Sequence, residues 1–329
     1  MLPSVRQLQY LKLLAEHGSF SRAAEAAAVT QPTLSAGIQE LERTLGAPVV
    51  ERARSGAILT EAGRQAVDRA GVILGQLEEL VQAARSAGQP LSGRFRLGVI
   101  PTIAPYLLPK ALPLLRERFP RLRLYLREDL SHRLVASLRS GALDAALIAL
   151  PYDLTGLRSA HVGDDDLMAL VPAGHRLAAS ERITPQALED EGLILLEGGH
   201  CLREHALAAC GLGPPSLSEE AFAATSLQTL VQMVGSGLGV SLAPAMAVEA
   251  GLARDAPVSV RPLAAEHPSR EIVVVWRAGS ARKAEAELLT DAFREAAQAG
   301  RPAPEEPRKG GPHSQNRREG GQPRRRQRP

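Results

Sequence analysis

The chain of 329 residues contains only two cysteines, Cys201 and Cys210, which stand nine residues apart. Basic side chains surround the first: His200 precedes it, and Arg203 and His205 follow it. The thiolate is the reactive form of cysteine, and cationic neighbours favour it by lowering the thiol pKa. This pattern predicts a reactive, redox-active Cys201. Cys210 follows a run of alanine and leucine, an apolar setting that predicts a protonated and unreactive thiol.

Two other interpretations of these residues stay open. Free cysteines are among the most buried residue types, so both thiols could simply belong to a hydrophobic core. His200, Cys201, His205 and Cys210 also supply four possible zinc ligands within a short segment. Adjacent residues such as His200 and Cys201 seldom both reach one metal ion, which argues against zinc. The sequence predicts no bound cofactor.

The spacing of the two cysteines restricts how a disulfide could form between them. In a helix, residues nine apart are separated by about 13–14 Å along the axis, whereas a disulfide needs Cα atoms within about 7 Å. A helical segment must therefore refold before the bond closes, which makes it a two-state element. Residues that would permit such remodelling bracket it: Gly198, Gly199, Gly211, Gly213, Pro214 and Pro215.

Residues 1–60 are predicted to form a small helical domain that ends in a short hairpin. Leucines recur at helical spacing over residues 8–14, and Gly18 ends that helix. Another helix begins at Gln31-Pro32, with proline near the first helical position, and ends at Gly46. Short apolar runs on either side of Gly56 predict two strands.

Residues 61–90 are predicted to form a long helix followed by a hinge at 86–90. Thr60 is the expected N-cap. The helix carries an apolar heptad seam and has no obvious partner in its own chain, so we expect it to dimerise with a second copy. The seam consists of Ala66, Ala70, Ile73, Leu77, Leu80 and Ala84.

Residues 91–299 alternate predicted strands and helices, which is typical of an α/β domain. Apolar runs such as 145–150 indicate buried strands, and we expect a mostly parallel sheet covered by helices. Two sets of strands predict two lobes with a cleft between them, as in periplasmic binding proteins. Residues 300–329 are rich in proline, glycine and arginine and are predicted to be disordered.

Residues 19–46, SFSRAAEAAAVTQPTLSAGIQELERTLG, resemble the helix-turn-helix of LysR-type transcription regulators, and residues 51–63 resemble their wing. The resemblance implies an N-terminal all-α winged helix-turn-helix that places its second helix in the major groove of promoter DNA. It implicates in base contacts Gln31, Pro32, Thr33, Ser35 and Gln39, and in phosphate or minor-groove contacts Arg22, Arg52 and Arg54.

Three later segments resemble the peroxide-responsive members of the same family: GVIPTIAPYLLP at 98–109, EGGHCLREHALAAC at 197–210 and ATSLQTL at 224–230. The resemblance implies that hydrogen peroxide oxidises Cys201 to a sulfenic acid, which Cys210 resolves to a reversible disulfide. It also implies a two-lobed sensor domain whose peroxide pocket is supported by His200, Arg203, Thr102, Ser131 and Arg270.

The same resemblance implies an activator of oxidative-stress genes that forms a homotetramer, contacts RNA polymerase and is recycled by a thiol reductant. Two alternatives remain: a LysR-type regulator that binds a small-molecule effector in the interlobe cleft, and a thiol peroxidase. The helix-turn-helix argues against a peroxidase, so no enzyme is expected. Asp164-Asp165-Asp166 indicates a solvated acidic loop, and the glycine-rich residues 235–239 indicate a tight turn.

The charge of the chain is concentrated in its C-terminal tail. The chain carries 39 basic and 36 acidic residues, and residues 301–329 hold nine of the basic and three of the acidic ones. The remaining body therefore has a net charge of −3. A barely cationic DNA-binding domain predicts weaker non-specific DNA binding unless the basic tail compensates, and a solubilising role of the tail is an equal alternative. No secretory signal or membrane-spanning run is visible, so we expect a cytoplasmic protein without membrane contact.

Overall fold

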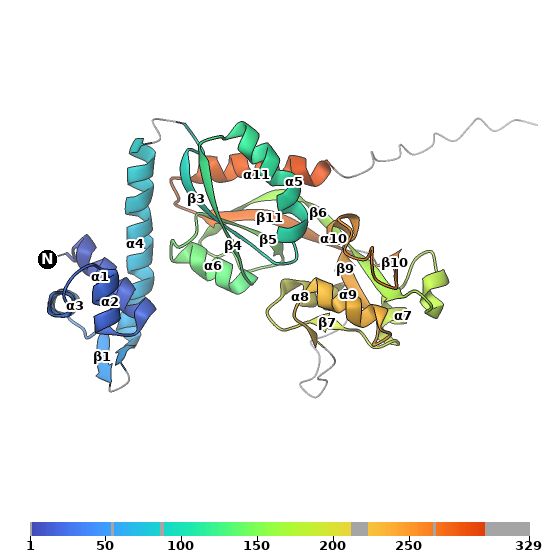
Figure 1. Ribbon diagram of the computed structural model, residues 1–329, viewed down its shortest axis with the longest axis horizontal. Helices are drawn as coiled ribbons and strands as arrows, with labels where there is room; N and C mark the ends of the chain where they lie inside the picture. Colours follow the sequence, from blue (N-terminus) through green and yellow to red (C-terminus); the bar gives the residue numbers. More distant parts are fainter. Residues whose placement is uncertain (1, 54–55, 86–88, 212–222, 266–267, 300–329) are drawn as a thin grey trace, which may run out of the picture.

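The computed structural model describes residues 2–53, 56–85, 89–211, 223–265 and 268–299. It consists of a small N-terminal domain, one long helix and a two-lobed α/β domain (Figure 1). The predictions for residues 86–88, for the tail at 300–329 and for Arg54 lie outside the described residues. Within the described ranges, no helix is both long and apolar enough to cross a membrane.

Three helices and a hairpin form the N-terminal domain, as the sequence predicts. The Ser4 and Thr30 side chains accept hydrogen bonds at the helix starts, and Gly18 and Gly46 end two helices in the left-handed conformation. Leucine side chains from these helices form the core. The elements are α1 Val5–His17, α2 Phe20–Ala26, α3 Gln31–Leu45, β1 Val50–Ala53 and β2 Gly56–Leu59.

The long helix α4, Glu61–Arg85, begins where it was predicted to begin. The Thr60 hydroxyl accepts a hydrogen bond from the Gly63 amide at 2.9 Å, which caps the first turn. Seam residues Ile73 and Leu80 are exposed, at 43% and 65%, and the Ala84 side chain lies outside the description.

The prediction that α4 has no partner in its own chain is wrong. Ala66 and Ala70 pack into the core of the N-terminal domain. A Cβ at Gly71 would stand 2.5 Å from the Ser140 carbonyl oxygen, so the α4 backbone also meets the α/β domain directly. The helix therefore joins the two domains within one chain, because small residues on both sides allow close approach.

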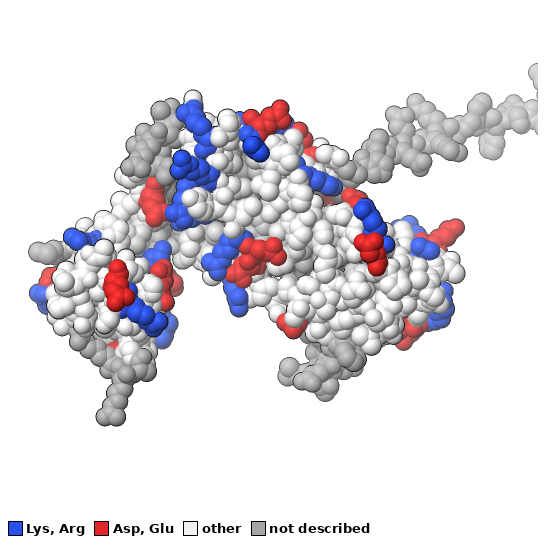
Figure 2. All heavy atoms as spheres, in the orientation of Figure 1, with Lys and Arg blue, Asp and Glu red and all other residues white. Residues whose placement is uncertain are grey.

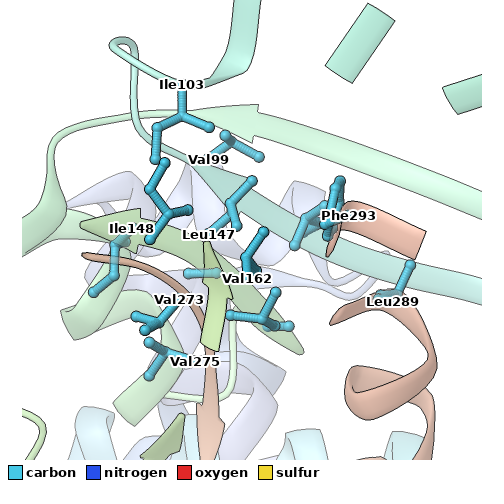
Figure 3. Close-up of a cluster of buried hydrophobic side chains, with 14 of the residues drawn as sticks. Val99, Ile103, Leu147, Ile148, Val162, Val273, Val275, Leu289 and Phe293 are labelled. Carbon is cyan, nitrogen blue, oxygen red and sulfur yellow. The ribbon is translucent and has the colours of Figure 1, made fainter. Parts of the chain in front are cut away.

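The first lobe of the α/β domain combines the first and the last segments of that domain. Figure 3 shows its core, in which Val99, Leu147 and Phe293 lie between the sheet and the last helix, while Val275 packs on the opposite face of the sheet. The elements are β3 Gly93–Val99, α5 Ala104–Arg118, β4 Leu122–Glu128, α6 Ser131–Arg139, β5 Ala145–Leu150, β11 Ser269–Arg277 and α11 Lys283–Gln298.

The second lobe contains shorter elements around a separate hydrophobic core. Strand β6, Leu157–Pro172, connects the lobes: its first part pairs with β11 and its last part with the second-lobe strands. The other elements are η1 Arg176–Ala179, α7 Pro185–Glu189, β7 Leu195–Leu196, α8 Cys201–Ala209, β8 Ala223–Ala224, α9 Leu227–Gly235, β9 Ser241–Pro244, α10 Ala245–Glu249 and β10 Val258–Pro262.

The two-lobed α/β architecture confirms the predicted fold class, but the expected mostly parallel sheet is wrong. The main sheet has the order β10-β6-β11-β5-β3-β4, with β9 also paired to β6. Strand β3 runs parallel to β4 and β5, whereas β6 pairs antiparallel with β9, β10 and β11. The chain leaves the first lobe along β6 and returns along β11 in the opposite direction, which apolar periodicity cannot reveal.

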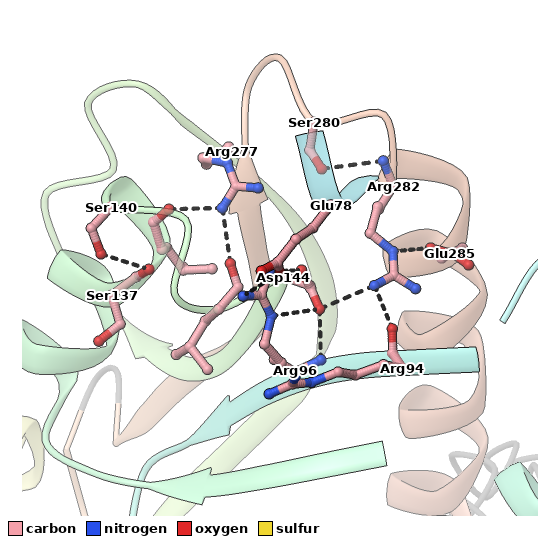
Figure 4. A network of polar contacts seen from close by, with 12 residues as sticks. Glu78, Arg94, Arg96, Ser137, Ser140, Asp144, Arg277, Ser280, Arg282 and Glu285 are labelled. Atoms are coloured by element: carbon pink, nitrogen blue, oxygen red, sulfur yellow. Dashed lines mark hydrogen bonds and ion pairs between the residues drawn. The ribbon is translucent and has the colours of Figure 1, made fainter. Parts of the chain in front are cut away.

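A polar network connects α4 to the first lobe (Figure 4). Asp144, which is 2% exposed, accepts hydrogen bonds from the Arg96 amide at 2.6 Å and from the guanidinium groups of Arg96 at 2.8 Å and Arg282 at 3.1 Å. Arg96 also forms an ion pair with Glu78 of α4 at 3.3 Å. One buried carboxylate therefore ties β3 and the start of α11 together, and Arg96 extends this tie to the long helix.

Candidate functional site

Helix α8 carries the two free cysteines into two different hydrophobic cores. Cys201 is the first residue of α8 and packs in the first-lobe core, whereas Cys210 follows the last residue and packs in the second-lobe core. Their exposures are 4% and 5%. A helical rise of about 13–14 Å over nine residues keeps the thiols beyond disulfide reach. The helical conformation considered for this segment is confirmed.

Cys201 lines a small hollow at the junction of the lobes, which has no room for a water molecule in this conformation. Thr102, which follows β3, and Ser131, the first residue of α6, line it together with His200. Thr102 and Ser131 are 3% and 2% exposed. Within the described part of the chain, the Ser131 Oγ has no well-formed hydrogen bond. The site thus brings two buried hydroxyls to the cysteine, as the resemblance implied.

Arg270 on β11 is the charged group of this junction, and it is 1% exposed. Its Nη1 donates to the Thr102 Oγ1 at 2.7 Å and its Nη2 to the Thr102 carbonyl oxygen at 2.9 Å. On its other side it forms an ion pair with Asp165 at 2.9 Å. The guanidinium lies close enough to lower the pKa of the Cys201 thiol. Arg270 is therefore at the predicted place beside the thiol.

The cationic group that acts on the Cys201 pKa is Arg270, and its effect is smaller than that of burial. Burial is the largest influence and raises the pKa of the thiol. The Arg270 charge and the Ser131 hydroxyl partly oppose this by lowering the pKa, and Glu204 raises it. The resting Cys201 is therefore a thiol whose ionisation depends on groups outside its own helix.

The basic residues next to Cys201 in sequence do not supply positive charge to it. Burial lowers the pKa of His200, and it lowers the pKa of His205 to about 4, so both imidazoles are neutral at pH 7. Arg203 donates from Nη1 to the Leu196 carbonyl oxygen at 3.0 Å. It joins α8 to strand β7 and so supports the site indirectly.

Cys210 has the unreactive character that the sequence predicts. Burial raises the pKa of its thiol to about 11, and the carboxylate of Glu189 adds to this effect. The thiol is therefore protonated at neutral pH. A disulfide between Cys201 and Cys210 requires at least one of them to leave its core.

The zinc-site interpretation is not supported by this geometry. Among the described residues, no group of three or more His, Cys, Asp or Glu side chains could hold a metal ion. Cys201 and Cys210 enter different cores, and the Nδ1 of His205 is buried without a hydrogen-bond partner among the described residues. The four possible ligands are close in sequence but do not form one site.

Asp165 is a site residue that the sequence analysis missed. The expected acidic loop at 164–166 is wrong, because these residues belong to β6. Alternation along the strand turns Asp165 inward, to 2% exposure, while Asp164 and Asp166 are exposed. One signal in the sequence could have indicated this burial. Asp165 stands two residues before Leu167, so in a strand both side chains face the same side.

The predicted DNA-contact residues lie at the start of α3 and on the neighbouring helix α2. Side chains of Arg22, Gln31, Pro32, Thr33 and Gln39 are exposed, and Ser35 is partly exposed. The α3 residues extend outward because Leu34, Ile38 and Leu41 hold the opposite face in the core. The Arg52 side chain is outside the description.

Charge is not concentrated on the N-terminal domain in the view of Figure 2. Basic and acidic side chains are interspersed over it, which agrees with the nearly neutral count in the sequence.

Comparisons with known proteins cover almost the whole described chain. Residues 5–64 match the family described as bacterial regulatory helix-turn-helix protein, lysR family, and residues 88–298 match the LysR substrate binding domain. The chain is 38% identical over 292 residues to a hydrogen peroxide-inducible genes activator of Dickeya chrysanthemi. The aligned region covers 89% of this chain and 95% of the relative.

Two further similarities agree with this. The chain is 38% identical over 291 residues to the DNA-binding transcriptional dual regulator OxyR of Escherichia coli K12, covering 88% of this chain and 95% of the relative. A solved structure of a full-length OxyR variant from Pseudomonas aeruginosa matches with a TM-score of 0.72 and 35% identity, covering 89% of this chain and 98% of that one.

Proposed function

The chain belongs to the LysR family of bacterial helix-turn-helix regulators, and from that premise we propose that it activates transcription in response to hydrogen peroxide, which it senses through Cys201 and Cys210. The observation that carries the proposal is the position of α8. One short helix holds two free thiols in separate cores, and its first thiol faces two buried hydroxyls beside a buried arginine.

The reaction begins in the small pocket at Cys201. The Cys201 sulfur attacks one peroxide oxygen, so that the S–O bond forms, the O–O bond breaks and the departing hydroxide takes the thiol proton as water. Thr102 accepts a hydrogen bond from Arg270 through its oxygen, which leaves its O–H available to the peroxide. The Ser131 hydroxyl is the second group suited to hold the oxidant.

The second step converts the oxidation into a change of shape. The Cys210 sulfur attacks the sulfur of the Cys201 sulfenic acid, water leaves and the disulfide forms. Because α8 separates the two thiols, it must unwind, and each core loses a buried cysteine. The oxidised protein therefore has a different lobe junction. A thiol reductant reverses the reaction with two electrons and two protons.

The signal is read by the N-terminal domain. We assign residues 1–60 to DNA binding, 61–90 to the linker and dimerisation, and 91–299 to sensing. The network around Asp144 and Glu78 gives the sensor a direct connection to α4. We propose a tetramer of two linked dimers, contact with RNA polymerase and a cytoplasmic location, in line with the family.

The other two interpretations have less support. A pocket at the lobe junction, lined in part by Tyr106, His161 and Met246, has a volume of about 210 Å³, whereas ligand sites usually measure roughly 300–1,000 Å³. This is small for an organic effector. The relatives reported above are named as regulators, which argues against a peroxidase.

Near-stoichiometric hydrogen peroxide should remove two mass units and both free thiols from the wild-type protein. Cys210→Ser should instead gain one oxygen as a trappable sulfenic acid, because the resolving thiol is absent. Intact mass and thiol counting measure both results. Cys201→Ser is the control and should keep its remaining thiol. Two unreacted thiols in the wild-type protein would rule out peroxide sensing at this site.

Gln31→Ala should weaken binding to the preferred DNA site by about 1–3 kcal/mol, which is roughly 5- to 150-fold. The amide is exposed at the start of α3, where it can bind a base edge in two places. Arg22→Ala serves as the comparison. It should weaken binding to all DNA sequences alike, and it should reduce the slope of log affinity against log salt concentration by about 1. Titrations on specific and scrambled DNA at two salt concentrations measure this. An equal loss on both DNAs for Gln31→Ala would show that it makes no base contact.

A further inference from the structure

Three N–H donors converge on the buried carboxylate of Asp165. The Oδ2 accepts from the Arg270 Nε at 3.0 Å and from its Nη2 at 2.9 Å, while the Oδ1 accepts from the Met246 amide at 2.9 Å. The side chains of Asp165 and Arg270 are 3% and 0% exposed. An amide in this place would turn its NH₂ toward one of these donors, so the position requires a carboxylate with two accepting oxygens.

This carboxylate determines where the Arg270 guanidinium can point. With Nε and Nη2 held by Asp165, the Nη1 is directed to the Thr102 Oγ1 at 2.7 Å. Both donors go to the single oxygen Oδ2, and Nη2 also donates to the Thr102 carbonyl oxygen at 2.9 Å. The guanidinium is rigid and planar, so a shift at one end moves the other. The Arg270 groups that donate to Thr102 in the Cys201 pocket are therefore positioned from β6, on the far side of the guanidinium.

The same carboxylate limits the positive field at the thiol. The charged and titratable groups around Cys201 are Arg270 from β11, Glu204, His205 and His200 on or beside α8, and Tyr152 after β5. Both histidines are neutral, so Arg270 supplies the positive charge among them. Asp165 lies against this guanidinium and cancels part of its field.

We propose that Asp165 is a positioning residue for the chemistry of Cys201: it aligns Arg270 with Thr102 and restrains how strongly the guanidinium stabilises the Cys201 thiolate. A strong thiolate would react with weak oxidants. Pairing with Asp165 weakens the effect of the arginine, so burial keeps the resting thiol protonated. The peroxide part of this inference rests on the proposed function. The ionisation part does not, since it concerns Cys201 alone.

Asp165→Asn in the Cys210→Ser background should lower the pH at which Cys201 ionises, because the Arg270 charge loses its counter-charge. A decrease of about one pH unit would raise the thiolate fraction about tenfold at pH values well below the midpoint. Thiolate absorbance at 240 nm measures this in the full-length protein, with Cys201→Ser/Cys210→Ser as the blank. Asp164→Asn is the matched control, since its side chain is 61% exposed, and it should leave the midpoint unchanged.

Asp165→Glu tests the positioning part and retains the charge if the asparagine variant fails to fold. It should keep the ionisation midpoint but oxidise more slowly with peroxide, because the longer side chain displaces Arg270 from Thr102. An unchanged or higher midpoint in folded Asp165→Asn, or an unchanged oxidation rate in Asp165→Glu, would overturn the inference. A lowered midpoint without any reaction with peroxide would leave the inference standing and reject the proposed function.

Discussion

Arg270→Met should destabilise the α/β domain by about 3–5 kcal/mol, because it leaves the Asp165 carboxylate buried without its counter-charge. It should also slow the oxidation of Cys201, since the thiolate loses the cation that stabilises it. Urea unfolding followed by tryptophan fluorescence measures the first effect. Trp276 is the single tryptophan of the chain and is buried in β11, so its signal reports this domain.

The double variant Arg270→Met/Asp165→Leu separates stability from chemistry. Replacing both members of a buried ion pair by apolar residues is often neutral for stability. We therefore expect the double variant to recover most of the free energy of unfolding, while Cys201 remains slow to oxidise. Parent-like oxidation in the double variant would show that the guanidinium is not needed at the thiol. A double variant no more stable than Arg270→Met would mean that the lost stability comes from packing.

Asp144→Ala should produce the second large effect, also about 3–5 kcal/mol, because Arg96 and Arg282 lose their shared buried carboxylate. The loss should be accompanied by looser attachment of α4, since Arg96 is the residue that reaches Glu78. Urea unfolding monitored at Trp276 measures the stability. Hydrogen exchange of the α4 amides measures the attachment, and should be faster in the variant.

Glu78→Gln is the matched control for this network. The Glu78 side chain is 63% exposed, so its ion pair with Arg96 should contribute no more than about 1 kcal/mol. We expect near-parent stability but faster exchange in α4, which would show that the contact couples the domains without holding the sensor together. Equal losses of stability in both variants would contradict the assignment of the buried carboxylate as the centre of the network.

The local elements could be predicted because their causes are local. The caps at Thr30 and Thr60, the helix ends at Gly18 and Gly46, and the apolar face of α3 are all set by residues within one or two turns. The separation of Cys201 and Cys210 could be predicted for the same reason, since it depends only on their spacing of nine residues in the sequence. Once α8 is helical, the distance between its ends follows from the rise per residue.

Strand direction and helix partners could not be predicted in this way. The alternation of apolar residues in β6 and β11 is the same whether the strands run parallel or antiparallel, so the expected parallel sheet was wrong. The apolar seam of α4 was likewise compatible with packing against a second copy of the chain or against the core of the N-terminal domain. Ala66 and Ala70 pack in that core, and Ile73 and Leu80 remain exposed.

The sequence by itself determined that this chain has a DNA-binding helix pair, a long linker and a cysteine pair that a helix holds apart. Only the tertiary structure decided how Cys201 ionises. Asp165 and Arg270 are 105 residues apart in sequence and meet where β11 returns along β6. His200 and His205, the neighbours in sequence, are neutral because burial removes the water that a charged imidazole needs. Short-range chemistry can be read along the chain, whereas burial and long-range charge pairing exist only after it folds.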